Sequence, residues 1–113
     1  MNTAEAIETL EALVRAADGG EPVVVATVVR TRGSTPRKEG ARMVVGPDGI
    51  LAGTVGGGCG EGQVLEAADE VLGDGRTRTV EVDLTEDLLT LSPAVCGGIL
   101  EVRVERVDPP VDP

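Results

Sequence analysis

The 113-residue sequence predicts a single domain of the α/β or α+β class, with a mixed β-sheet of five or six strands and two main helices. Three observations predict it. The length suits one core, because domains usually have roughly 100–150 residues. Valine-rich runs alternate with two segments of helical periodicity. The absence of Phe, Tyr and Trp leaves an aliphatic core, in which valine favours strands. We place the domain at residues 1–107 and expect residues 108–113 to form a disordered tail.

The first helix is expected at residues 4–17. Apolar residues recur there at helical spacing, namely Ile7, Leu10, Val14 and Ala17. Asn2 and Glu5 offer a capping box, and Gly19 a stop signal. The helix is therefore predicted to be amphipathic. Its polar face, which ordinary solvation explains, carries Glu5, Glu8, Glu11 and Arg15.

The strands follow from short β-branched runs. Residues 22–30 are almost continuously apolar, which is typical of a central strand buried on both faces. Two further strands, at residues 41–46 and 50–55, flank a glycine-containing turn and predict a hairpin. Alternating patterns predict strands at residues 77–84 and from Ile99 to Val107. A second helix is expected at residues 63–73, and one helical turn at residues 85–89.

Composition excludes several classes of function. The net charge of −10 opposes binding to nucleic acids and anionic membranes, and no aromatic ring is available to stack on bases. No signal peptide or membrane-spanning run is recognisable, so we expect a cytoplasmic protein in which both cysteines are thiols. The lack of histidine excludes Ser-His-Asp and Cys-His catalysis, and two cysteines cannot form a four-ligand zinc site.

Positive charge is concentrated in one segment. Residues 30–42 hold half of the basic residues of the chain and one acidic residue, Glu39. A solvated hairpin tip explains this charge as well as a binding site does. The same segment contains GSTPR, in which Arg37, or else Arg42 beyond it, could make a bidentate contact to a phosphate or carboxylate. Ser34 or Thr35 could add a hydroxyl.

The most informative segment is GTVGGGCGEGQV, at residues 53–64. Its glycines let the backbone approach a ligand closely, and the helix that follows directs free N–H groups toward an anion. It matches neither the phosphate-binding P-loop nor the dinucleotide-binding glycine pattern. A glycine-rich turn without a ligand is the alternative interpretation.

Two cysteines stand in glycine settings. Cys59 precedes the second helix, whose N-terminus favours the thiolate, while Glu61 opposes that effect. Cys96 stands beside Gly97 and Gly98, which suggests a site shared by both thiols. A buried structural cysteine is the alternative in each case.

Taken together, GSTPRKEGARMVV, GGGCGEGQVLEAA and CGGILEV resemble the N-terminal domain of the XdhC/CoxI family, from about residue 23 to residue 105. The resemblance implies an accessory protein for molybdenum hydroxylases such as xanthine dehydrogenase or carbon monoxide dehydrogenase. Such a chaperone would not be an enzyme. It would bind the molybdenum cofactor, molybdopterin, as cargo, and would assist its sulfuration or its insertion into the apoenzyme.

The family motifs correspond to three groups of residues here. The cofactor-binding residues that the resemblance and the residue chemistry together suggest are Gly33, Ser34, Arg37, Arg42, Gly56, Gly57, Gly58, Cys59, Gly60, Glu61, Cys96, Gly97 and Gly98. Cys59 is the candidate to lie near the molybdenum. Gly60 departs from the family, which often has a larger apolar residue there, and we expect it to make the loop more mobile.

The longer family members also have a C-terminal Rossmann-like domain, so this chain resembles a stand-alone N-terminal domain. The expected partners are a molybdenum hydroxylase apoenzyme, a cysteine desulfurase or a separate Rossmann-like protein, and further copies of the chain in a homo-oligomer. Two other functions remain open on the residues alone. One is a thiol-dependent redox or sulfur-transfer protein that uses Cys59 and Cys96, and the other is a structural interaction domain.

Overall fold

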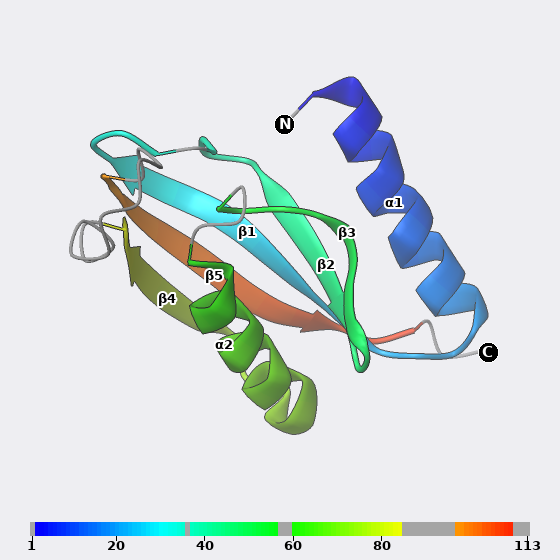
Figure 1. Cartoon of the computed structure of the whole chain (residues 1–113). Helices are drawn as coiled ribbons and strands as arrows, with labels where there is room; N and C mark the ends of the chain where they lie inside the picture. The colour runs from blue at the N-terminus through cyan, green and yellow to red at the C-terminus, as the bar shows by residue number, and fades with distance from the viewer. Residues whose placement is uncertain (1, 36, 57–59, 85–96, 110–113) are drawn as a thin grey trace.

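The central strand β1 organises the protein, as the computed structural model in Figure 1 shows. The structure describes residues 2–35, 37–56, 60–84 and 97–109. Its elements are α1 (Thr3–Asp18), β1 (Val23–Arg32), β2 (Arg42–Gly46), β3 (Gly49–Gly53), α2 (Glu61–Asp74), β4 (Arg78–Asp83) and β5 (Ile99–Val107). They confirm the predicted helices, hairpin and strands, while the helical turn expected at residues 85–89 lies outside the described residues. No helix in the described ranges has the length and apolarity needed to cross a membrane.

The sheet has five strands in the order β3-β2-β1-β5-β4. Each pairing that the structure describes is antiparallel, so the fold is α+β and the sheet is not mixed. The physical reason lies in the connection from β3 through α2 to β4. These two strands run in the same direction, but the connection places them at opposite edges of the sheet, where they cannot pair.

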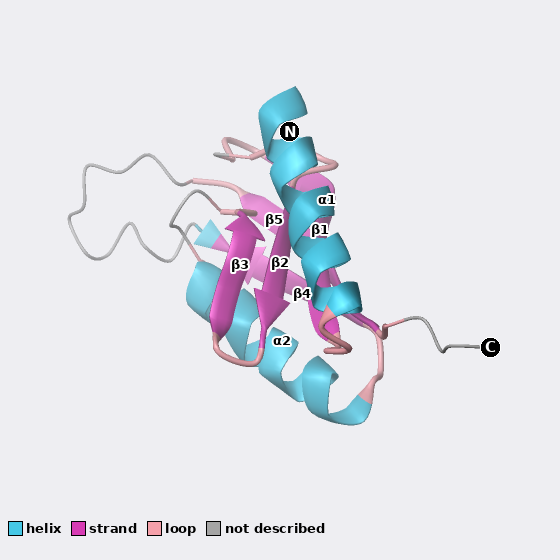
Figure 2. Cartoon of the chain, turned by 90° about the vertical axis from the view of Figure 1, so that its right-hand side faces the viewer, coloured by secondary structure: helices cyan, strands magenta, loops and turns pink. Residues whose placement is uncertain are grey.

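The two helices lie on opposite faces of the sheet. This follows from the side chains of β1, which point alternately to the two faces and belong to two different core clusters. Val24, Ala26 and Val28 face α2, which packs on β1, β4 and β5. Val23 faces α1, which packs on β2 and β3 (Figure 2). This explains why the first six residues of β1 are all buried, as the sequence predicted.

Helix α1 docks through a different face from the one its apolar spacing suggests. Its buried residues are Thr9 and Ala12, and Leu13 and Ala16 pack beside them against the sheet. Ile7, Leu10 and Val14 instead remain 50%, 60% and 59% exposed. The predicted apolar face therefore points outward, whereas Glu8, Glu11 and Arg15 of the predicted polar face are exposed as expected.

Two glycines give a matched test of the fold. Gly53 has a φ of +77°, and a Cβ there would lie 2.1 Å from the carbonyl oxygen of Arg42. We expect Gly53→Ala to lower the free energy of unfolding by about 2 kcal/mol or more, through backbone strain and steric overlap.

Gly73 lies inside α2 with open space around it. Gly73→Ala should therefore stabilise the protein by roughly 0.5–1 kcal/mol. Urea unfolding of both variants measures these changes. Equal stability of the two variants would contradict the packing described here.

Candidate functional site

One end of the sheet gathers the three segments that the sequence singles out. Strands β1, β3 and β4 run in the same direction and end at Arg32, Gly53 and Asp83. The segment that begins at Gly33 follows β1, the glycine loop follows β3, and Gly97 and Gly98 lead into β5 at this same end (Figure 1). The antiparallel pairing of the sheet thus brings together segments that are far apart in the sequence.

Gly33 and Ser34 contact Gly97 and Gly98 directly. The β1–β5 ladder continues to the last residue of β1, where Arg32 pairs with Ile99. Beyond it the N–H of Gly97 donates to the carbonyl of Ser34 over 3.3 Å. A Cβ on Gly98 would lie 2.5 Å from the carbonyl oxygen of Arg32 and 2.8 Å from that of Ser34. Only glycine allows the two backbones to come this close.

Thr35 stabilises this contact, although the sequence suggested it only as a hydroxyl interchangeable with that of Ser34. The side chain of Thr35 is buried, and its Oγ1 donates to the carbonyl of Arg37 over 2.8 Å. Its methyl group packs over Gly98, where an added Cβ would lie 2.6 Å from it. The β-branched side chain, which serine lacks, was the signal in the sequence.

Gly60 connects the second glycine segment to this cluster. It precedes α2 with a φ of +70°, and a Cβ there would lie 2.4 Å from Val82 and 2.9 Å from Leu84. A larger apolar residue has no room in this arrangement, so Gly60 itself is closely packed. The expected mobility of the loop concerns residues 57–59, which lie outside the described residues, and stays a prediction. The N–H of Leu84 in turn donates to the carbonyl of Gly98 over 2.9 Å. The described parts of all three segments therefore meet at the end of β4.

Glu61 begins α2 beside this cluster. Its carboxylate accepts a hydrogen bond from the hydroxyl of Thr54, which follows β3. This contact joins the two ends of the glycine loop. Val55 and Gly56, between them, are buried. Gly60 has no side chain with which to cap the helix, so backbone N–H groups in the first turn of α2 have no cap from that residue.

Four of the predicted site residues cannot be placed. Gly57, Gly58, Cys59 and Cys96 lie outside the described residues. The predicted convergence of loop amides on an anion, and the shared site of the two thiols, stay predictions.

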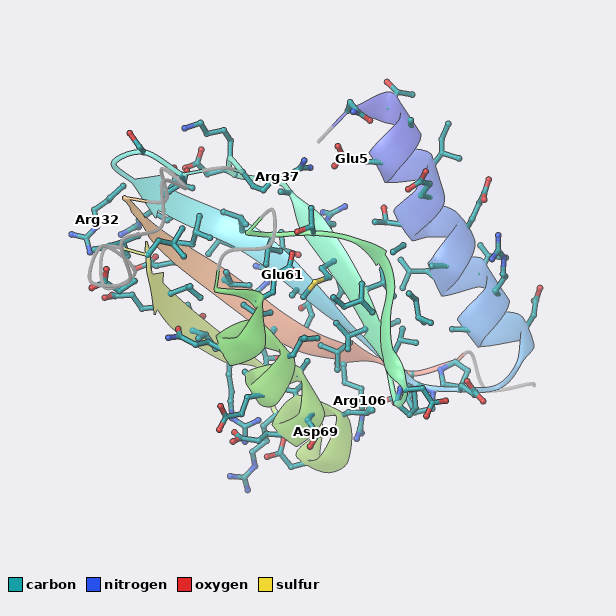
Figure 3. The ribbon with its side chains drawn as sticks, viewed as in Figure 1. Glu5, Arg32, Arg37, Glu61, Asp69 and Arg106 are labelled. Carbon is teal, nitrogen blue, oxygen red and sulfur yellow. The ribbon has the colours of Figure 1, made fainter. Side chains whose placement is uncertain are left out.

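The two arginines proposed from the sequence do not join the glycine contacts. Arg37 forms a two-pronged ion pair with Glu5 of α1, in which Nη1 lies 3.2 Å from Oε1 and Nη2 pairs with Oε2 (Figure 3). Only about a fifth of the Arg37 side chain is exposed. Arg42 lies in an exposed position at the start of β2, opposite Thr27. The polar face of α1 is therefore not purely solvated.

Arg32 is the cation that sequence reasoning passed over as a site residue. It is the last residue of β1, directly before Gly33, and its side chain is exposed at the end of the sheet where the glycines meet (Figure 3). Among the described residues it has no ion pair, whereas its neighbour Arg30 lies 3.6 Å from Glu101. Its position directly before the GSTPR segment was the available signal.

Comparison with known proteins identifies the family of the chain. The sequence model of the XdhC and CoxI family matches residues 16–83, which contain the first two glycine segments. The chain belongs to the XdhC and CoxI family. The resemblance that the motifs suggested is thereby confirmed.

Relatives within the family are longer than this chain. A probable xanthine dehydrogenase subunit of Bacillus subtilis is 37% identical over 90 residues, which cover 77% of this chain and 27% of that protein. A molybdenum cofactor insertion chaperone, PaoD of Escherichia coli, is 42% identical over 67 residues, which cover 59% of this chain and 21% of that protein. The crystal structure of a xanthine dehydrogenase from Bacillus halodurans has a TM-score of 0.73 and 38% identity, and the match covers 88% of this chain and 30% of that one.

The Arg37 pair predicts a dependence of stability on pH. The hydrogen bond from Arg37 holds the pKa of Glu5 below its ordinary value of 4.5. Above pH 4.5 the carboxylate is ionised in both the folded and the unfolded chain, so the pair contributes fully to stability. As the pH falls below 4.5 and through the lowered folded pKa, protonation removes that contribution.

We therefore expect Glu5→Gln to destabilise the protein most at neutral pH and progressively less below pH 4.5. The measurement is the urea midpoint of both proteins across the acid range. Glu8→Gln, at an exposed position on the same helix without an ion pair among the described residues, is the matched control. A difference between wild type and Glu5→Gln that does not change with pH would contradict the pairing.

A second pair of glycines tests the contact between the segments. Gly98→Ala should destabilise the protein by about 2 kcal/mol or more, because its Cβ would overlap the carbonyl oxygens of Arg32 and Ser34. Gly97→Ala, with open space at its Cβ position, should change stability far less. Thermal unfolding distinguishes them, and equal losses would show that the backbones do not meet closely at Gly98.

Proposed function

We propose that this chain binds the molybdenum cofactor at the glycine-lined end of its sheet and assists the sulfuration of the cofactor or its insertion into a molybdenum hydroxylase apoenzyme. In this role it is an accessory protein and not an enzyme, and the cofactor is its cargo. The observation that carries the proposal is the meeting of Gly33, Gly60 and Gly98 with their neighbours at one end of the sheet.

The chemistry of molybdopterin fits the groups near this end. The molecule carries a phosphate and a metal bound through two sulfur atoms, so its site requires backbone donors, a cation and soft ligands. Backbone N–H groups stand at the start of α2, behind a residue that offers no side-chain cap. Arg32 offers an exposed guanidinium beside Gly33. Cys59 precedes α2 in the sequence, and we assign it to the molybdenum or to the incoming sulfur.

Arg37 is the weaker candidate for a contact to the phosphate. Its guanidinium is occupied by Glu5, so it can reach a phosphate only if that pair opens. Arg32 has no such competitor among the described residues, which makes it the stronger candidate for the phosphate contact. The names of the relatives support the wider role, since PaoD is named as a molybdenum cofactor insertion chaperone and the Bacillus proteins are named for xanthine dehydrogenase.

Cofactor retention tests the proposal. The protein would be purified together with a source of molybdenum cofactor, and bound pterin would be quantified by fluorescence after oxidation. We expect wild type to retain pterin and Cys59→Ala to retain little, because a ligand near the metal is lost. We expect Arg32→Ala to weaken retention about tenfold, as the loss of one charge-assisted contact implies, and Arg37→Ala to weaken it less.

Arg15→Ala is the matched control, because it removes the same charge from an exposed site on α1, away from the glycines. Equal retention by wild type, Cys59→Ala and Arg32→Ala would remove the site assignment. Formation of a disulfide between Cys59 and Cys96 that cycles with a thiol reductant would favour the redox function instead.

A further inference from the structure

The outer face of α1 carries an apolar stripe, defined by Ile7, Leu10 and Val14. Each of these side chains is at least half exposed, and together with Glu11 and Arg15 they line a shallow, open groove on the helix surface. Their spacing of three and four residues places them on one side of the helix. Large apolar side chains that gather on one face, with polar residues at the rim, commonly mark a docking surface.

The fold of this domain does not use the stripe. Helix α1 already packs on β2 and β3 through Ala12, Leu13 and Ala16, which lie on a different side of the helix. With 16 residues, α1 offers a surface about 24 Å long, which matches a partner helix of about four turns. An amphipathic helix recognised through anchors at i, i+3 and i+7 has this geometry.

Charge indicates the kind of partner. Glu8 and Glu11 lie exposed along one flank of the stripe, and Asp18 continues that row toward the C-terminal end of α1. The one basic residue of the flank, Arg15, lies 3.6 Å from Glu11, so the flank as a whole keeps a negative charge. The chain as a whole has a net charge of −10, which repels a second copy of itself and attracts a basic segment.

We propose that the stripe on α1 binds an amphipathic helix of a partner protein whose apolar face is flanked by lysine or arginine. The partner's leucine-sized side chains pack between Ile7, Leu10 and Val14. Its basic flank lies along Glu8 and Glu11. This surface lies on the opposite face of the sheet from α2, and the proposal does not depend on cofactor binding.

A designed peptide provides the test. Its probe form is a helix of about four turns with leucine at the a and d positions and lysine at the e and g positions. A second form replaces the lysines by glutamates. We expect the intact protein to bind the lysine peptide saturably in a fluorescence anisotropy titration and not to bind the glutamate peptide. Raising the ionic strength should weaken the binding.

The variant Leu10→Gln should weaken binding about tenfold, because one central apolar contact is lost. Leu10 is 60% exposed, so this variant should keep the thermal midpoint of the wild type. Ile50→Gln is the matched control, since Ile50 is also a large apolar residue, 43% exposed, and does not line the groove on α1. It should bind the peptide as the wild type does.

Three outcomes would overturn the proposal. Equal binding of the two peptides would show that the surface does not select a basic partner. Equal binding by Leu10→Gln and wild type would show that the stripe is not the binding surface. A wild-type dimer in sedimentation equilibrium that Leu10→Gln converts to a monomer would show that a second copy occupies this face.

Discussion

The contact of bare backbones at the end of the β1–β5 ladder is the constraint on which the rest of the site depends. Gly98 lies against the carbonyl oxygens of Arg32 and Ser34, at a distance that leaves no space for a side chain. The hydrogen bond from Leu84 to Gly98 then fixes the end of β4, against which Gly60 packs. A single tight contact thus sets where the segment after β1 and the start of α2 lie relative to one another.

The proposed function gains a physical basis from this arrangement. An anionic cofactor requires donors that already point toward it, because ordering a flexible loop on binding costs conformational entropy. Here the two ends of the glycine loop are tied, at Thr54 and Glu61 by a hydrogen bond and at Gly60 by packing. Arg32, which directly precedes Gly33, is exposed, while Arg37 is paired with Glu5. The positive charge of Arg32 is therefore available to a ligand, whereas the charge of Arg37 helps to hold α1 in place.

Helix α1 shows how tertiary packing can override a sequence pattern. Its apolar residues recur at the spacing of a buried face, yet a different face docks on the sheet, made of Thr9, Ala12, Leu13 and Ala16. The pair between Glu5 and Arg37 crosses 32 positions in the sequence and helps to fix the rotation of the helix. Sequence patterns act over a few residues, so they could not predict that these two residues pair. The result leaves Ile7, Leu10 and Val14 on the outer surface of the helix, where we propose that a partner helix binds.

The sequence by itself determined the order and type of the elements, because valine runs, glycine turns and helical periodicity are local properties of the chain. Its motifs also determined the family, and they named Gly33, Gly60 and Gly98 before their contacts were seen. Only the tertiary structure decided that the described strand pairings are antiparallel, that Arg37 binds Glu5, and that Thr35 packs against Gly98 of a second segment. Those features depend on which residues, far apart in the sequence, come into contact in the fold. The local spacing of residues along the chain does not specify those contacts.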